Sequence, residues 1–177
     1  MGAEFMDLVF FQEQTVSNDS KCVVWVNSVL ELEKLKKKSE SKQSVVIGLL
    51  KTDDLLCSKA KSSGFEVLAD CPSAPSAMWA VRRKIDFALV RLNTSKPVID
   101  LAIVNVAAEN GVTLLVALSD WWGEPVFRWP ALFRNAFWVA KLCKKTKVKA
   151  AVISGAKTKW QNRGSKERLA FANWLGF

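Results

Sequence analysis

Basic and aromatic residues recur at helical spacing in the C-terminal part of the chain. Arg134, Trp138, Lys141 and Lys145 follow one another at steps of four, three and four residues. Such steps place side chains on one face of an α-helix. A basic stripe with an embedded aromatic suits a phosphate backbone, because the cations release counterions and an indole can stack on a base. The same spacing also fits a solvated helix face on which Trp138 packs against a neighbouring element.

A second cationic group follows the last strand-like run of the sequence. Gly155 would let the backbone approach a ligand closely, and it is followed by Lys157, Lys159, Trp160 and Arg163. Ligands of parallel α/β folds bind at the carboxyl ends of strands, and late barrel loops often hold phosphate. Arginine grips a phosphate bidentately, whereas lysine acts as a point charge. The pattern favours a phosphate-binding loop, with an ordinary polar loop as the alternative.

The distribution of charge also favours a polyanionic partner. The formal net charge is +9, and ten basic residues but one acidic residue lie between Lys141 and Arg168. The rest of the chain holds sixteen of each sign, so the whole surplus falls in this segment. A concentrated surplus of cations is typical of nucleic-acid-binding surfaces.

The chain contains no histidine. This removes the commonest general base, the commonest metal ligand and every Ser-His or Cys-His nucleophile. The four cysteines show no C-x-x-C spacing, so we expect reduced thiols rather than a zinc site. They are Cys22, Cys57, Cys71 and Cys143.

Four aspartates could contribute to a site. Asp86 opens a predicted strand and Asp100 lies at the start of a predicted helix, so we expect structural roles for both. Asp70 and Asp120 each follow a predicted strand. Because no partner base or metal ligand accompanies them, we expect these two carboxylates to be surface residues.

Apolar runs alternate with amphipathic segments along the chain. Most of the runs are continuous, which is typical of parallel strands buried on both faces. The predicted strands are residues 8–11, 22–26, 44–50, 65–68, 86–90, 112–118 and 149–154. The predicted helices are residues 28–39, 52–63, 75–84, 97–110, 130–146 and 165–175. Thr52 is the expected N-cap of the second helix, Pro97 the expected start of the fourth, and Phe137 part of the buried side of the fifth.

About seven βα steps predict a TIM-barrel-like α/β fold. A full eight-fold barrel takes about 250 residues, so a chain of 177 residues indicates an incomplete or trimmed barrel. We interpret residues 1–5 as an expression-tag remnant and residues 6–177 as a single domain. With no signal peptide and no apolar stretch near the length of a bilayer, we expect a cytoplasmic protein without a membrane partner.

From about residue 85 onward the sequence resembles ribonuclease P protein component 3, an archaeal and eukaryotic family related to metal-dependent hydrolases. Four segments in the family's order and spacing carry the resemblance over roughly half of the chain. They are Ile85-Asp86-Phe87-Ala88, Pro97-Val98-Ile99-Asp100, Asn110-Gly111-Val112-Thr113-Leu114, and the stretch from Lys147-Val148 through Val152-Ile153-Ser154-Gly155-Ala156, Lys159-Trp160 and Arg163 to Leu175-Gly176.

The resemblance implies a non-catalytic, RNA-binding subunit of an endoribonuclease whose RNA removes the 5′ leader from precursor tRNA. The implied partners are ribonuclease P RNA, precursor tRNA, a small ferredoxin-like protein subunit and other ribonuclease P proteins. Magnesium would be used by the partner RNA, and this chain would bind no cofactor and no metal. A eukaryotic source would imply a nuclear or nucleolar location. The basic residues expected around the strand at residue 85 fall here as Arg82, Arg83, Lys84 and Arg91, and we include Arg82 and Arg83 among the expected RNA contacts.

Two other interpretations remain. A stand-alone barrel enzyme could bind a phosphorylated small molecule through the loop after residue 154, with Asp70 or Asp120 as base. A pure scaffold could dock a protein through the aromatic loop at Trp121-Trp122, which could equally pack over the end of the barrel.

Overall fold

Seven parallel strands form one sheet in chain order. The computed structural model describes residues 7–9, 20–38, 45–156 and 163–177. The strands pair in the order β1-β2-β3-β4-β5-β6-β7, each parallel to the next. They are β1 (Asp7–Val9), β2 (Ser20–Val26), β3 (Val45–Leu49), β4 (Glu66–Cys71), β5 (Phe87–Val90), β6 (Thr113–Ala117) and β7 (Ala150–Ile153). All seven predicted strands are confirmed, with shifts at their ends.

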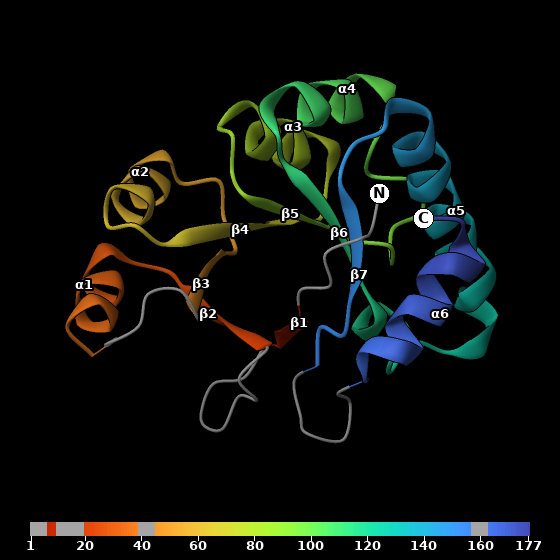
Figure 1. The fold of residues 1–177 in the computed structure, drawn as a ribbon, viewed down its shortest axis with the longest axis horizontal. Helices are drawn as coiled ribbons and strands as arrows, with labels where there is room; N and C mark the ends of the chain where they lie inside the picture. The colour runs from red at the N-terminus through yellow and green to blue at the C-terminus, as the bar shows by residue number, and fades with distance from the viewer. Residues whose placement is uncertain (1–6, 10–19, 39–44, 157–162) are drawn as a thin grey trace.

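The sheet curls so that its two edges approach each other. Cα atoms of β1 and β7 lie within 8 Å, although no β1–β7 ladder is found in the described part of the chain. The helices lie outside the sheet, and all but the last connect successive strands (Figure 1). They are α1 (Val29–Lys38), α2 (Asp54–Ser62), α3 (Ala74–Arg82), α4 (Leu101–Asn110), α5 (Trp129–Thr146) and α6 (Ser165–Leu175). This is the expected TIM-barrel-like fold, trimmed to seven strands in the described part of the chain.

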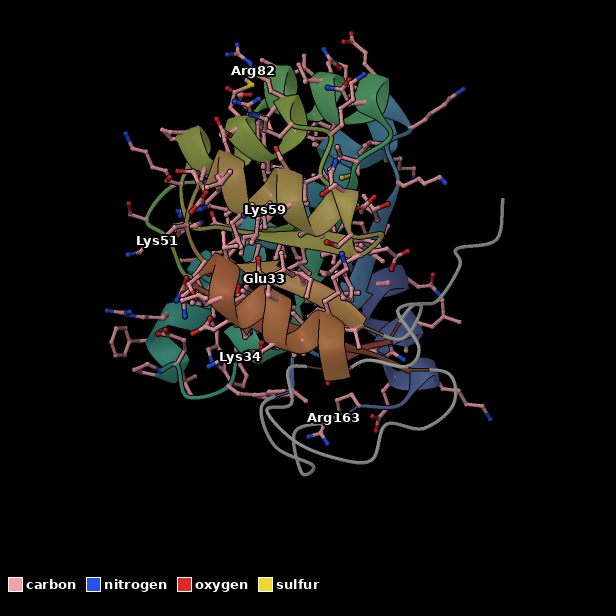
Figure 2. The ribbon with its side chains drawn as sticks, turned by 90° about the vertical axis from the view of Figure 1, so that its left-hand side faces the viewer. Glu33, Lys34, Lys51, Lys59, Arg82 and Arg163 are labelled. Carbon is pink, nitrogen blue, oxygen red and sulfur yellow. The ribbon has the colours of Figure 1, made fainter. Side chains whose placement is uncertain are left out.

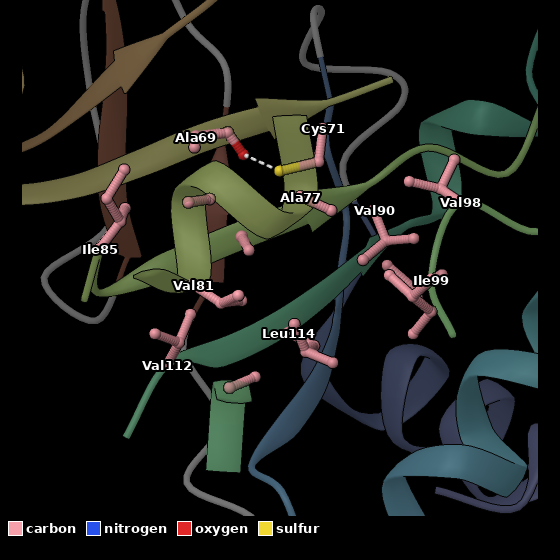
Figure 3. Close-up of a cluster of buried hydrophobic side chains, with 14 of the residues drawn as sticks. Ala69, Cys71, Ala77, Val81, Ile85, Val90, Val98, Ile99, Val112 and Leu114 are labelled. Carbon is pink, nitrogen blue, oxygen red and sulfur yellow. Dashed lines mark hydrogen bonds between the residues drawn. The ribbon is translucent and has the colours of Figure 1, made fainter. Parts of the chain in front are cut away.

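Two hydrophobic layers result from the alternation of side chains along each strand. The larger layer lies between the sheet and the helices and includes Ala69, Val90 and Leu114 (Figure 3). The smaller layer fills the inside of the curled sheet. Its buried members are Val23, Val46, Leu68, Phe87, Leu89, Leu115, Ala117 and Ile153. Side chains therefore fill the barrel interior, and any binding site must lie at its ends or on its surface.

The caps of two helices differ from the sequence prediction. Asp53, not Thr52, is the N-cap of α2, because its carboxylate accepts the N–H of Leu56 at 2.9 Å. Helix α4 begins at Leu101 rather than at Pro97, and Asp100 is its N-cap, accepting the N–H of Ile103 at 2.9 Å. A carboxylate satisfies a free helical N–H better than the competing residues do.

Three cysteines of the described region are free, buried thiols: Cys57, Cys71 and Cys143. Burial raises the pKa of Cys71 and that of Cys143 from 9.0 to about 12. The unfolded chain ionises these thiols above pH 9, whereas the folded chain keeps them neutral. Their contribution to stability is thus complete below pH 9 and is lost as the pH rises toward 12.

We therefore expect the free energy of unfolding to fall above pH 9 by up to about 1.4 kcal/mol per pH unit for each thiol. Urea unfolding at pH 8, 9.5 and 10.5 measures this loss. Lysines also titrate in this range, so the matched control is the Cys71→Ala/Cys143→Ala variant, whose stability should fall less steeply. Equal slopes for the two proteins would contradict the assignment.

Candidate nucleic-acid interface

The first half of α5 holds the segment that follows β5. Asn135 Nδ2 donates to the carbonyls of Leu92 and Thr94 at 2.8 and 2.9 Å. On the predicted stripe, Arg134 Nη2 donates to the carbonyl of Ser95 at 2.9 Å, and Trp138 Nε1 donates to that of Ile99 at 3.0 Å. Arg134 is exposed and the Trp138 side chain is 41% exposed. These two residues therefore have a structural role, which for Trp138 is the packing against a neighbouring element that the spacing also allowed, and their contact with RNA stays a prediction.

The second half of α5 carries the cations of the stripe. Lys141 and Lys145 are both exposed, and neither forms an ion pair with a described carboxylate. Because α5 connects two parallel strands, it runs against their direction and ends beside the amino end of β7. These lysines thus lie toward the amino ends of the strands.

The loop after β7 lies at the opposite end of the barrel. Gly155 is buried and has a φ of 60°, a left-handed conformation that favours glycine. Ser154 Oγ accepts the backbone N–H of Arg163 at 3.2 Å, and the exposed Arg163 guanidinium lies 5.7 Å from the centroid of the Trp122 ring. The predicted contacts Lys157, Lys159 and Trp160 fall outside the described residues.

Lys145 at the end of α5 and Arg163 in the loop consequently lie at opposite ends of the barrel. The length of β7 with its flanking residues separates them by roughly 16 Å along the strand direction. They are close together in the chain, but the end of the helix and the loop meet β7 at opposite ends. A partner that touched both groups would have to extend along the side of the barrel.

Arg82 and Arg83 differ in their surroundings. Arg82 is exposed in the last turn of α3, whereas Arg83 forms an ion pair with Asp54 of α2. Figure 2 shows Arg82 and Arg163 at opposite extremes of the molecule. Arg82 therefore belongs to a different part of the surface from the loop after β7.

The aromatic loop after β6 closes one end of the core. Trp121 is 8% exposed and lies against Phe133 of α5 and Phe171 of α6, with ring centroids at 5.6 and 5.1 Å. Phe137 is 41% exposed and contacts Trp174 of α6, so its predicted burial inside α5 is wrong. Helix α5 turns Asn135 and Ala136 toward the core in its place.

An ion-pair network at the carboxyl ends of β4, β5 and β6 was missed by the sequence analysis. Arg91 Nε donates to Asp70 at 2.6 Å, and its Nη1 donates to Asp120 at 2.9 Å. Asp120 also accepts the backbone N–H of Leu92 at 2.9 Å. The expectation of surface carboxylates is wrong for Asp120, whose side chain is 3% exposed, while that of Asp70 is 15% exposed.

The alternation of side chains explains this position. Leu68 and Leu89 point into the barrel, and side chains two residues apart on a strand lie on the same face. Asp70 and Arg91, each two residues further on, therefore point into the mouth of the barrel. Burial raises the pKa of the Asp120 carboxyl, against the lowering effect of Arg91 and of the Leu92 N–H. Burial lowers the pKa of Arg91, but Asp70 and Asp120 more than reverse this, so Arg91 stays charged. The network is one guanidinium held between two carboxylates.

Seven parallel strands, outer helices and exposed cations at both ends define an α/β barrel-like protein with a basic surface. No protein-family profile and no curated protein sequence matches the chain. Its structure is similar to that of a chain from the cryo-EM structure of archaeal ribonuclease P with mature tRNA. The TM-score is 0.72 at 16% identity, over 97% of this chain and 82% of that chain.

Two enzymes share the architecture at lower TM-scores. One is a prolidase complexed with N-methylphosphonate-L-proline, with a TM-score of 0.58 at 11% identity over 96% of this chain and 52% of the prolidase. The other is an amidohydrolase, with a TM-score of 0.51 at 15% identity over 81% of this chain and 40% of that chain. This chain thus spans about half or less of each enzyme. At these identities, likeness establishes the fold alone.

No group of three or more His, Cys, Asp or Glu side chains among the described residues could hold a metal ion. None of the helices described is both long and apolar enough to span a membrane.

Proposed function

We propose that this chain is a non-catalytic, RNA-binding protein subunit of ribonuclease P. In this role it assists the catalytic RNA in removing the 5′ leader from precursor tRNA. The observation that carries the proposal is the similarity to the archaeal ribonuclease P chain, which extends over 97% of this chain and 82% of the other. The exposed cations support it, because neutralising phosphates is the main source of affinity for RNA.

The proposed partners are ribonuclease P RNA, precursor tRNA and a small ferredoxin-like protein subunit, with other ribonuclease P proteins. Magnesium serves the RNA and is not bound by this chain. The proposed RNA contacts are those of the sequence analysis: Arg82, Arg83, Arg134, Lys141, Lys145, Lys157, Lys159 and Arg163, with Trp138 and Trp160 as stacking residues and Gly155 as the point of close backbone approach. The proposed location is the cytoplasm, or the nucleus and nucleolus in a eukaryote.

Reconstitution tests the proposal. Ribonuclease P RNA is assayed for cleavage of precursor tRNA with and without this protein, in the presence of its small protein partner. We expect faster cleavage with the protein and no nuclease activity of the protein alone. An RNA whose cleavage is unchanged by the protein would contradict the proposal.

Charge reversal should weaken the gain in cleavage. Lys141→Glu and Arg163→Glu each remove one proposed phosphate contact, so each should lower the slope of log K against log salt by about one unit. Lys34→Glu on α1 is the control, because Lys34 is exposed and is not among the proposed contacts (Figure 2). Salt titrations of RNA binding measure the slopes. Site variants that behave like Lys34→Glu would remove Lys141 and Arg163 from the interface.

The alternative function is a stand-alone barrel enzyme acting on a phosphorylated small molecule. The shared architecture with a prolidase and an amidohydrolase favours it. Against it, the carboxylates of Asp70 and Asp120 are engaged by Arg91. A cavity of about 310 Å³ near the barrel mouth is lined by Asn93, Thr94, Ser95, Glu124 and Arg128 among others, and not by either aspartate. Turnover of a phosphorylated compound without RNA would favour this alternative.

A further inference from the structure

Four helices end with the same backbone motif. In α2, α3, α4 and α6 a left-handed residue lies one or two positions past the helix, and the N–H after it donates to a carbonyl five residues earlier. These bonds are Phe65 N–H to Ala60, Ile85 N–H to Ala80, Val112 N–H to Ala107 and Phe177 N–H to Ala172, at 3.2, 3.2, 2.9 and 3.1 Å. The left-handed residues are Gly64, Lys84, Gly111 and Gly176, with φ of 79°, 53°, 70° and 89°. Glycine is the unstrained choice at this position, so Lys84 is the exception.

A second lysine shares this conformation. Lys147 follows α5 with a φ of 57°, and it and Lys84 are the two non-glycine residues with positive φ in the described part of the chain. A side chain at such an angle strains the backbone, and strain of this kind concentrates at functional positions. The helix dipole favours cations in a last turn, which accounts for Lys144 and Lys145 of α5. The helix dipole does not account for lysines in a left-handed conformation. A glycine at these positions would remove the strain, and the neighbouring cations would still supply the positive charge.

Topology places both lysines on one end of the barrel. Each lies where a helix ends and the chain returns to a strand, which is the amino end of the sheet. Helix α4 packs against both α3 and α5 and so separates the two positions (Figure 1). Asn110 Nδ2 at the end of α4 donates to the carbonyl of Val81 in α3 at 2.9 Å, which fixes these helix ends to each other.

The surroundings of Lys84 and Lys147 are cationic. Both side chains are exposed, and no ion pair of either is found among the described residues. The exposed cations at this end are Arg82, Lys84, Lys144, Lys145, Lys147 and Lys149. They outnumber the carboxylates of Glu66, Asp86 and Glu109, and the Asp86 carboxylate already accepts the N–H of Val67 at 2.9 Å.

We propose that an RNA backbone docks across the ends of α3, α4 and α5, with Lys84 and Lys147 as two phosphate contacts on either side of α4. The two contacts are roughly 16–20 Å apart, the width of two adjacent helix packings. Lysine acts here as a point charge, so the contact does not depend on base sequence. This inference rests on the proposed RNA-binding function and assigns its docking face to the amino end of the barrel.

The test is the Lys84→Gly/Lys147→Gly variant of the whole chain. Binding of fluorescein-labelled ribonuclease P RNA is followed by anisotropy between 50 and 300 mM salt. We expect affinity to fall roughly tenfold near 0.15 M salt and the salt slope to fall by about two units. The melting temperature should stay the same or rise, because glycine relieves both left-handed positions. A loss of affinity without loss of stability separates a binding role from a structural one.

Two further variants make the test decisive. Lys51→Gly/Lys96→Gly removes the same charge from exposed positions after β3 and β5, at the other end of the barrel, and should leave affinity within about twofold. Gly111→Lys adds a cation between the two sites, and a Cβ there meets nothing within 4 Å. It should raise affinity and lower the melting temperature.

The outcomes separate this inference from the function on which it rests. If the glycine variant binds RNA as the Lys51→Gly/Lys96→Gly control does, the docking face is wrong while the proposed subunit function stands. If the unmodified chain does not bind ribonuclease P RNA at all, both fail.

Discussion

Replacing Arg91 with methionine should cost about 3–5 kcal/mol of folding free energy at neutral pH, because it leaves an unpaired charge in the barrel mouth. The Asp120 side chain is 3% exposed and would lose the guanidinium at 2.9 Å, keeping the N–H of Leu92. Asp70 would face Asp120 without the cation between them. Urea denaturation of the variant and of the unmodified chain measures the loss.

The pH dependence of this loss identifies its cause. In the variant the folded-state pKa of Asp120 must lie further above its unfolded value than it does now. The loss of folding free energy due to Asp120 is then absent below the unfolded-state pKa of this carboxyl, where both states are protonated. It grows as the pH rises through the folded-state pKa. We therefore expect the difference between variant and unmodified chain to be smaller at pH 5 than at pH 8.

The matched control is Arg128→Met. Arg128 pairs with Glu124 at 3.2 Å, but its side chain is 58% exposed, so water replaces the lost contact. Exposed pairs of this kind contribute less than about 1 kcal/mol. If Arg91→Met cost no more folding free energy than Arg128→Met, the ion pairs of Arg91 would not stabilise the mouth of the barrel as their geometry indicates.

Gly48→Ala should destabilise the chain by about 1–3 kcal/mol, because the interior of the barrel has no room for a methyl group. A Cβ built on Gly48 would lie 2.4 Å from Cε3 of Trp25 and 2.8 Å from Cδ2. These two residues are directly paired across β2 and β3. The indole ring occupies the space that a side chain on β3 would take.

Two variants test this explanation. Trp25→Leu should make Gly48→Ala less costly, so the two substitutions should be clearly non-additive in a double-mutant cycle of thermal or urea unfolding. Gly164→Ala is the control, because nothing lies within 4 Å of a Cβ there and its φ is −63°. Additive effects of the Trp25 and Gly48 substitutions would show that the ring is not what excludes the methyl group.

The parallel strands and the helices were predictable because their signals are local. Continuous apolar runs predicted all seven strands, and the predicted helices at residues 52–63 and 97–110 end within one residue of α2 and α4. The errors fall where two local signals compete. Thr52 and Asp53 are adjacent candidates for one cap, and Pro97 and Asp100 are rival starts of α4. In both cases the chain uses the carboxylate that reaches a free N–H.

The surfaces were less predictable because helical spacing does not say what a face meets. Arg134 and Trp138 have the spacing of an exposed stripe, yet both donate to carbonyls of the segment after β5. Lys141 and Arg163 lie close together in sequence but at opposite ends of β7. The strained Lys84 and Lys147 carry no sequence signal, since their backbone angles depend on how each helix joins its strand.

The sequence by itself determined the order of strands and helices, the apolar runs that are buried on both faces of the sheet, and a surplus of positive charge near the C-terminus. Periodicity, caps and composition act over a few residues, and for this reason they can be read without coordinates. Only the tertiary structure decided which charges meet. The parallel pairing of β4, β5 and β6 brings Asp70, Arg91 and Asp120 together from three strand ends. This result does not follow from local sequence, because the distances depend on strand pairing between residues far apart in the chain.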